Sequence, residues 1–137
     1  MAEKSFKILL ISHDQLAKGL LSSIKFFITE VENVAAIAAF SEITHVKEAI
    51  VDWLTQNSDY DRLIVTDIVG GSINQTAFKL LKEHDFYLVS GMNLALLLEI
   101  MFMDKITEES LSLAVSNAKD QIILMNSVSI ETEEEEF

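Results

Sequence analysis

The amino-acid sequence predicts a doubly wound α/β fold, in which a mainly parallel sheet of about four strands carries helices on both faces. Short runs of consecutive aliphatic residues alternate with segments in which apolar residues recur every three or four positions. A strand that is apolar at every position is typical of a parallel sheet covered on both faces. The length of 137 residues suits one domain, which we place at residues 1–130.

The predicted strands are residues 7–12, 33–40, 62–67 and 86–90. The helical segments that follow them span residues 16–28, 46–54, 73–81 and 94–103. In the first of these helices, Leu16, Leu20 and Ile24 lie on one face, which is the pattern of a helix packed on a sheet. The last helix, LALLLEIMFM, is apolar on nearly all sides and needs burial beyond one face of the sheet.

The C-terminal part of the sequence predicts one more helix and a tail. Residues 108–127 place Leu111, Ala114 and Ala118 along one side of a helix. The segment from Val128 to Ile130 can add a short edge strand to the sheet. Residues 131–137 are rich in glutamate, and we expect them to form a solvated acidic tail.

Composition excludes several classes of function. Lys and Arg number 10 against 22 Asp and Glu, so the net charge of -12 disfavours nucleic acid and anionic membranes as partners. The absence of cysteine excludes a disulfide framework, a thiolate metal site and a cysteine nucleophile. The longest apolar runs, residues 94–98 and 100–103, are too short to span a bilayer. We therefore expect a cytoplasmic protein that does not insert into the membrane.

Polar residues follow the predicted strands at their carboxyl ends, where ligands bind in this architecture. His13 ends the first strand and Asp67 ends the third. A carboxylate that accepts a hydrogen bond from Nδ1–H of a histidine fixes its tautomer and leaves the Nε2 lone pair free. His13 can then act as a nucleophile or general base, whereas His45 and His84 lie in predicted helices without such neighbours.

A glycine turn follows Asp67. Gly70 and Gly71 precede Ser72, which we predict to be the N-cap of the next helix. Backbone N–H groups of such a turn can hold a phosphoryl group or another anion. We predict that Asp14 caps the first helix, because a carboxylate is favoured there and the spacing of His13, Asp14 and Asp67 matches no metal-ligand pattern.

Three motifs, in this order, resemble the IIA component of the mannose class of the bacterial phosphoenolpyruvate-dependent sugar phosphotransferase system. They are ILLISHDQLAKGL, LIVTDIVGGSINQTAF and LVSGMNLALLLEI, and the similarity covers roughly residues 5 to 125. The first carries the histidine, the second the aspartate with the Gly-Gly-Ser turn, and the third a Gly-x-Asn stretch that leads into an apolar helix.

The resemblance implies that His13 accepts a phosphoryl group from the phosphocarrier HPr and passes it to a IIB domain during sugar uptake through the membrane subunits IIC and IID. Asp67 would orient His13, and Gly70, Gly71 and Ser72 would hold the phosphoryl oxygens. The family forms homodimers, which implies that LALLLEIMFM and the predicted strand at residues 128–130 contribute to an interface. Such a carrier needs no cofactor, and the sequence has no nucleotide-binding P-loop or dinucleotide motif.

One residue departs from the family pattern, which usually has a small residue, often glycine, where this chain has Asp14. Three other functions stay open at this point. A receiver-like signalling module would be phosphorylated on Asp67, with Mg²⁺ held by acidic residues after the first strand. A hydrolase would use Ser72 or a water activated by His13, although no G-x-S-x-G motif is present. In a regulatory or binding module, His13 would be structural only.

Overall fold

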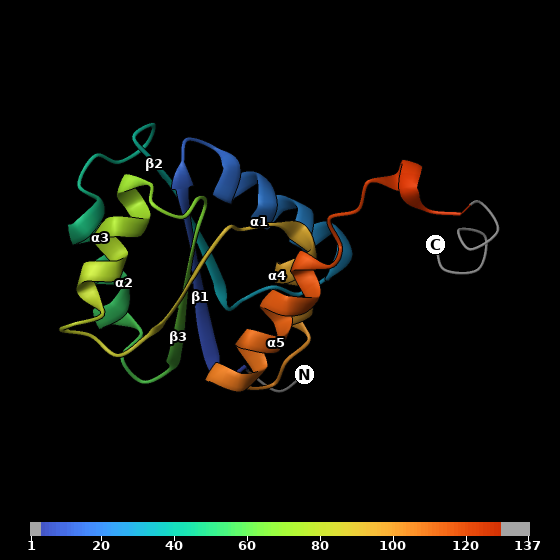
Figure 1. Ribbon diagram of the computed structural model, residues 1–137. Coiled ribbons are helices and arrows are strands. Elements are labelled where there is room, and N and C mark those ends of the chain that lie inside the picture. Colours follow the sequence, from blue (N-terminus) through green and yellow to red (C-terminus); the bar gives the residue numbers. More distant parts are fainter. Residues whose placement is uncertain (1–3, 130–137) are drawn as a thin grey trace.

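A computed structural model describes residues 4–129 of the chain, in which strands and helices alternate (Figure 1). The strands are β1 (Phe6–His13), β2 (Val34–Ala39), β3 (Asp61–Thr66) and β4 (Tyr87–Ser90). The helices are α1 (Leu16–Phe27), α2 (Val46–Gln56), α3 (Ser72–Leu80), α4 (Leu94–Met101), α5 (Glu108–Lys119) and the short 3-10 helix η1 (Met125–Ser127). The four predicted strands and the helices between them are confirmed.

The four strands form one parallel sheet in the order β2-β1-β3-β4. From β1 the chain crosses outward to β2, whereas β3 and β4 follow one another on the other side of β1. The strand order therefore reverses between β1 and β3, and ligands of doubly wound folds bind beyond the carboxyl ends of the strands at this reversal. In the register of the two strands, Ile11 lies opposite Thr66, so the residues that follow each strand end emerge together.

Helices cover both faces of the sheet, as predicted. Figure 1 shows α2 and α3 on one side and α1, α4 and α5 on the other. Along β1, Phe6, Ile8 and Leu10 pack against α1, α4 and α5, while Leu9 and Ile11 pack against α2 and α3. All five side chains are at most 1% exposed. Each such side chain contributes about 1.5–3 kcal/mol on burial, so β1 contributes strongly to the stability of the core.

The apolar helix α4 obtains its burial within the chain. Its residues Leu96, Leu97, Ile100 and Met101 are buried, and α4 packs against α1 and α5 as well as the sheet. The burial beyond one face of the sheet that the sequence predicts is therefore provided, for these four residues, by α1 and α5.

The C-terminal helix ends earlier than predicted, at Lys119 rather than near residue 127. Ile122 and Leu124, which follow it, are 86% and 70% exposed, so neither side chain packs in the core. Val128 is not in a strand. Ile130 and the acidic segment 131–137 lie outside the described residues. Within residues 4–129, no helix combines the length and the apolar character needed to cross a membrane.

Candidate functional site

The site centres on a direct contact between His13 and Asp67. His13 is the last residue of β1, and Asp67 follows β3, its neighbour in the sheet. His13 Nδ1 lies 2.8 Å from Oδ2 of Asp67, and the backbone N–H of His13 donates to the same oxygen, also at 2.8 Å. The backbone bond fixes the carboxylate relative to β1, and the ring bond fixes the imidazole relative to the carboxylate. The structure thus places the two predicted residues together.

The surroundings of Asp67 keep it ionised. Its side chain is 8% exposed, compared with 42% for His13, and its Oδ1 accepts the N–H of Ile68 at 3.0 Å. Burial by itself would raise the pKa of Asp67. Hydrogen bonds from His13 and Ile68 and the attraction to a charged His13 outweigh burial, so this pKa lies below its ordinary value of 3.8. An ionised carboxylate only accepts hydrogen bonds, so the proton on His13 belongs to Nδ1 and the lone pair to Nε2.

The free nitrogen of His13 points toward Ser72, whose Oγ lies 3.5 Å from Nε2. Ser72 is not the N-cap as predicted. It is the first residue of α3, the N-cap is Gly71, and no side chain caps this helix. The first backbone N–H groups of a helix have no partner within it, so they and the Ser72 hydroxyl are available to an anion bound at Nε2.

The two glycines serve different purposes in the turn. Gly70 has a φ of 81°, in the left-handed region that glycine adopts without strain. Gly71 has an ordinary φ, but a Cβ built there would lie 3.1 Å from Cγ1 of Ile68 and 3.5 Å from Cε1 of His13. A side chain at this position would therefore crowd Ile68 within the turn, whereas its distance from the imidazole would be that of an ordinary van der Waals contact.

The predicted cap of the first helix was wrong. Asp14 makes no capping bond, whereas Oγ of the buried Ser12 accepts the backbone N–H of Ala17 at 2.7 Å. Ser12 faces α1 because it follows Leu10 on the same side of β1. Asp14 has a φ of 53°, which aspartate tolerates better than most residues. This left-handed turn explains why glycine suits the position.

Sequence reasoning missed one neighbour of His13. The ring of Phe40, which directly follows β2, has its centroid 5.5 Å from that of the imidazole, with 35° between the planes. Nothing in the sequence separates this phenylalanine from an ordinary strand end. The contact between Phe40 and His13 depends on the pairing of β1 with β2, in which His13 lies opposite Ala39.

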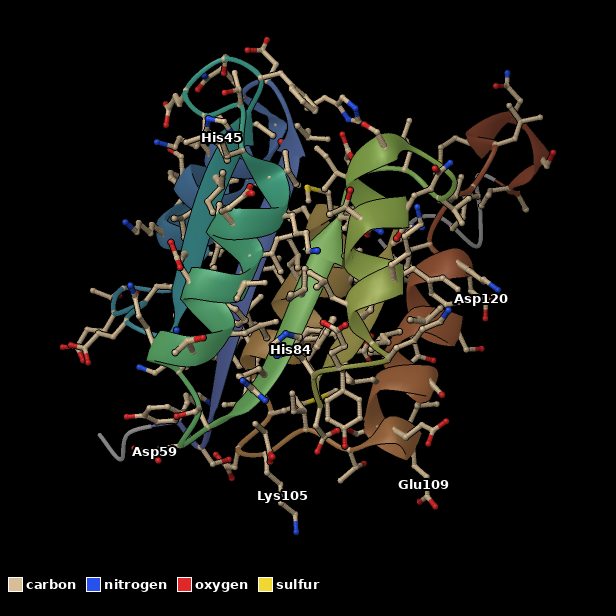
Figure 2. All side chains as sticks on the ribbon, turned by 90° about the vertical axis from the view of Figure 1, so that its left-hand side faces the viewer. His45, Asp59, His84, Lys105, Glu109 and Asp120 are labelled. Atoms are coloured by element: carbon tan, nitrogen blue, oxygen red, sulfur yellow. The ribbon has the colours of Figure 1, made fainter. Side chains whose placement is uncertain are left out.

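The other two histidines lie apart from this pair. His45 precedes α2 and, with Phe40 and Ser72, lines a groove of about 290 Å³ beside the site. His84 follows α3 at the opposite end of that helix from Ser72, and Figure 2 shows it well away from His45. Among residues 4–129, no group of three or more His, Cys, Asp or Glu is arranged to hold a metal ion.

The residues that follow β4 stabilise the fold. Asn93, which belongs to the Gly-x-Asn stretch after β4, caps α4 by accepting the N–H of Leu96 at 2.9 Å. The N–H groups of Gly91 and Met92 both bond to the carbonyl of Thr66. This turn therefore ties β4 to the end of β3 and supports the segment that carries Asp67.

Comparisons with known proteins agree with the fold. Residues 7–119 match the family model EIIA-man, described as "PTS system fructose IIA component". The IIA protein associated with the fucose utilization operon of Streptococcus pneumoniae is 25% identical, with a TM-score of 0.78 over 92% of this chain and 97% of that one. The mannose/sorbose-specific IIA subunit of Enterococcus faecalis is 17% identical, with a TM-score of 0.76 over 93% and 99% of the two chains.

A third similar structure is a Klebsiella pneumoniae protein provisionally described as a phosphoenolpyruvate-dependent sugar phosphotransferase system permease. It is 24% identical, with a TM-score of 0.80 over 93% of this chain and 96% of that one. A search of curated proteins finds no significant match.

Proposed function

The chain belongs to the EIIA-man family of sugar phosphotransferase system IIA components, and from this premise we propose that it carries a phosphoryl group on His13 between phospho-HPr and a IIB domain. Family membership supports a phosphocarrier role in sugar transport. Phosphorylation of His13 and the identity of the donor and acceptor are our proposal. We place the reaction on the cytoplasmic side of the membrane, where IIB would serve the membrane subunits IIC and IID.

The geometry around His13 suits this reaction. The Nε2 lone pair attacks the phosphorus atom, the Nε2–P bond forms, and the P–N bond to the donor histidine breaks. The electron pair of that bond returns to the donor. The Nδ1 proton stays in place, so the phosphorylated imidazole carries a positive charge opposite the carboxylate of Asp67, 2.8 Å away. Transfer to IIB reverses these steps.

The observation that carries the proposal is that one carboxylate oxygen accepts two hydrogen bonds from His13. Oδ2 of Asp67 holds both the backbone and the ring of His13, so Nε2 is directed at Ser72 before any donor arrives. Such pre-organisation removes part of the entropic cost of bringing two reacting groups together. The Ser72 hydroxyl and the N–H groups that begin α3 would hold the phosphoryl oxygens, with Gly70 and Gly71 shaping the turn.

Phosphorylation of Asp67 itself, the receiver-like alternative, fits the site less well. Both of its oxygens accept hydrogen bonds, and its side chain is almost fully buried. A phosphoryl donor would have to displace His13 to reach it.

A hydrolase is the second candidate function, because Asp67, His13 and Ser72 form a row similar to a serine hydrolase triad. The distance of 3.5 Å between Nε2 and the Ser72 hydroxyl is long for proton transfer. Hydrolysis of a simple ester, lost in both Ser72→Ala and His13→Ala variants, would favour this candidate.

The proposal is tested by intact-protein mass after incubation with phosphoenolpyruvate, enzyme I and HPr. We expect one phosphoryl group, labile in acid and stable in alkali, which is absent in His13→Ala. His84→Ala is the matched control, because it removes a histidine from the opposite end of α3 and should be labelled like the wild type. Labelling of His13→Ala, or a label lost in alkali as an aspartyl phosphate would be, would contradict a phosphohistidine.

We also propose that the chain forms a homodimer, with the segment at residues 128–130 in the interface. Within the described residues β4 pairs only with β3, and a groove of about 640 Å³ lies beside it, lined by Leu88, Val89 and Val115 among others. Sedimentation equilibrium should give twice the chain mass, and a Val128→Asp, Ile130→Asp variant should shift the population toward monomer. A monomeric wild type would contradict the dimer.

A further inference from the structure

Phe40 occupies an unusual backbone conformation next to His13. Its φ is 68°, in the left-handed region that residues with bulky side chains rarely adopt. Two backbone hydrogen bonds hold this turn: Phe40 N–H donates to the carbonyl of Ile43 at 2.6 Å, and Glu42 N–H donates to that of Ala38 at 3.0 Å. Neither bond involves the aromatic ring, and glycine would form the same turn without strain.

Burial does not explain the phenylalanine at this position. The residue is 53% exposed, so its ring gains little from the hydrophobic core. The aromatic partner that the structure gives it is the imidazole of His13, at 5.5 Å between centroids. Strained residues concentrate at functional sites, where another part of the structure supports them. A strained and half-exposed aromatic side chain against the nucleophile therefore points to a function in the reaction.

The remaining freedom of His13 indicates what that function is. Asp67 holds Nδ1, but the imidazole can still tilt about this bond, because the Nε2 contact to Ser72 is long at 3.5 Å. The His13 side chain is 42% exposed. The ring of Phe40 packs against the imidazole.

Phe40 both contacts the imidazole and lines the adjoining groove. That groove is lined by Phe40 together with Ser72, Ile73 and the residues that begin α2. If the ring of Phe40 were absent, water in the groove would reach Nε2 and any phosphoryl group bound to it.

We propose that Phe40 is a positioning residue for the phosphoryl transfer: its ring restricts the tilt of the His13 imidazole and excludes water from one side of Nε2. This inference rests on the proposed function, because water exclusion matters only if His13 carries a phosphoryl group. Loss of the ring would leave the tautomer of His13 intact, since Asp67 determines it, but would loosen the imidazole and expose the P–N bond to hydrolysis.

The main test uses Phe40→Gly, which removes the ring and suits a positive φ, so the variant should melt at or above the wild-type temperature. Phe40→Tyr keeps an aromatic ring and should retain wild-type behaviour. Phe102→Ala is the matched control, because Phe102 is 76% exposed at the end of α4, on the side of the sheet away from α2 and α3.

Two measurements are made on each variant. The first is the half-life of the phosphoprotein at neutral pH, after phosphorylation with phosphoramidate, which transfers its phosphoryl group to Nε2 with ammonia as the leaving group. We expect hydrolysis to be about three- to tenfold faster in Phe40→Gly, as follows from the strength of an aromatic pair. The second is the NMR line width and water exchange of the His13 Nδ1–H in the unphosphorylated protein, which should increase in Phe40→Gly alone.

Unchanged hydrolysis and unchanged Nδ1–H exchange in Phe40→Gly would overturn the inference. So would equal effects of Phe40→Gly and Phe40→Tyr, because the ring would then be irrelevant. A wild type that phosphoramidate labels but phospho-HPr does not would contradict the proposed partner and leave the role of Phe40 to be decided by the hydrolysis rates. If neither reagent labels the protein, the Nδ1–H exchange decides whether Phe40 positions the ring.

Discussion

Replacement of Asp67 by asparagine changes the site more than any other conservative substitution. The carboxylate accepts three hydrogen bonds, two from His13 and one from Ile68. Asparagine has one accepting oxygen, so its NH₂ group must face either the N–H of Ile68 or the two donors of His13. Each arrangement leaves at least one part-buried donor without its partner, which costs at most about 1–3 kcal/mol of stability.

The effect of Asp67→Asn on transfer should be larger than its effect on folding. A hydrogen bond to a charged group contributes about 1.5–3 kcal/mol, and the charge on the phosphorylated imidazole develops only during the reaction, so we expect transfer to slow about 10- to 150-fold. Rapid-quench mass spectrometry with phospho-HPr measures the rate. Asp59→Asn is the matched control, because it removes the same charge from an exposed position at the far end of the molecule (Figure 2). A rate for Asp67→Asn within threefold of the wild type would refute the orienting role of the carboxylate.

The stability of Asp67→Asn should also depend on pH differently from that of the wild type. The pKa of Asp67 is lower in the folded protein than its ordinary value of 3.8, so its contribution to stability is present above pH 3.8 and is lost as the pH falls through the folded pKa. The difference in free energy of unfolding between the wild type and Asp67→Asn should therefore shrink below pH 3.8. A difference that stays constant between pH 6 and the acid limit of folding would show that the ionised form is not what stabilises the site.

Four further substitutions separate the contributions of the site residues from those of the helices around them. Ser72→Ala should leave the melting temperature unchanged, because the residue is exposed, and should slow transfer about two- to tenfold in the rapid-quench assay. Gly71→Ala should slow transfer because its Cβ would lie only 3.1 Å from Cγ1 of Ile68, which would have to move within the turn beside His13. Gly19→Ala, with nothing within 4 Å of the added Cβ in α1, should instead stabilise the fold by about 0.5–1 kcal/mol in thermal denaturation. Ser12→Ala should lower the free energy of unfolding by about 1–2 kcal/mol in denaturant titration, because the hydrogen bond that caps α1 is lost. The transfer rate of the folded protein should stay within twofold of the wild type. An unchanged free energy of unfolding would contradict the cap.

Local patterns were sufficient for the four strands and the helices between them, although not for the end of α5. The strand predicted at residues 62–67 is β3, Asp61–Thr66, because a run of aliphatic residues that ends in Thr-Asp has few alternatives. Where prediction failed, a tertiary contact decided the outcome. Asp14 and Ser12 are both reasonable caps for α1, and only the side of β1 on which Ser12 lies shows that it reaches the helix.

The sequence alone determined the fold class and the edge of the sheet that carries the site. Aliphatic runs and helical spacing are local properties, and in a parallel sheet the residues that follow every strand emerge at the same edge. His13, Asp67 and Ser72 could therefore be assigned to one region from their positions after the predicted strands. The tertiary structure decided which of them touch: the placement of β3 beside β1 joins His13 and Asp67 across 54 positions, and the packing of α3 brings Ser72 to Nε2 across 59. The role of Phe40 depends on the same kind of contact, because a ring in a left-handed turn reaches the imidazole only when β2 pairs with β1. Side-chain contacts of this kind depend on strand order and layer packing, which the whole chain determines together.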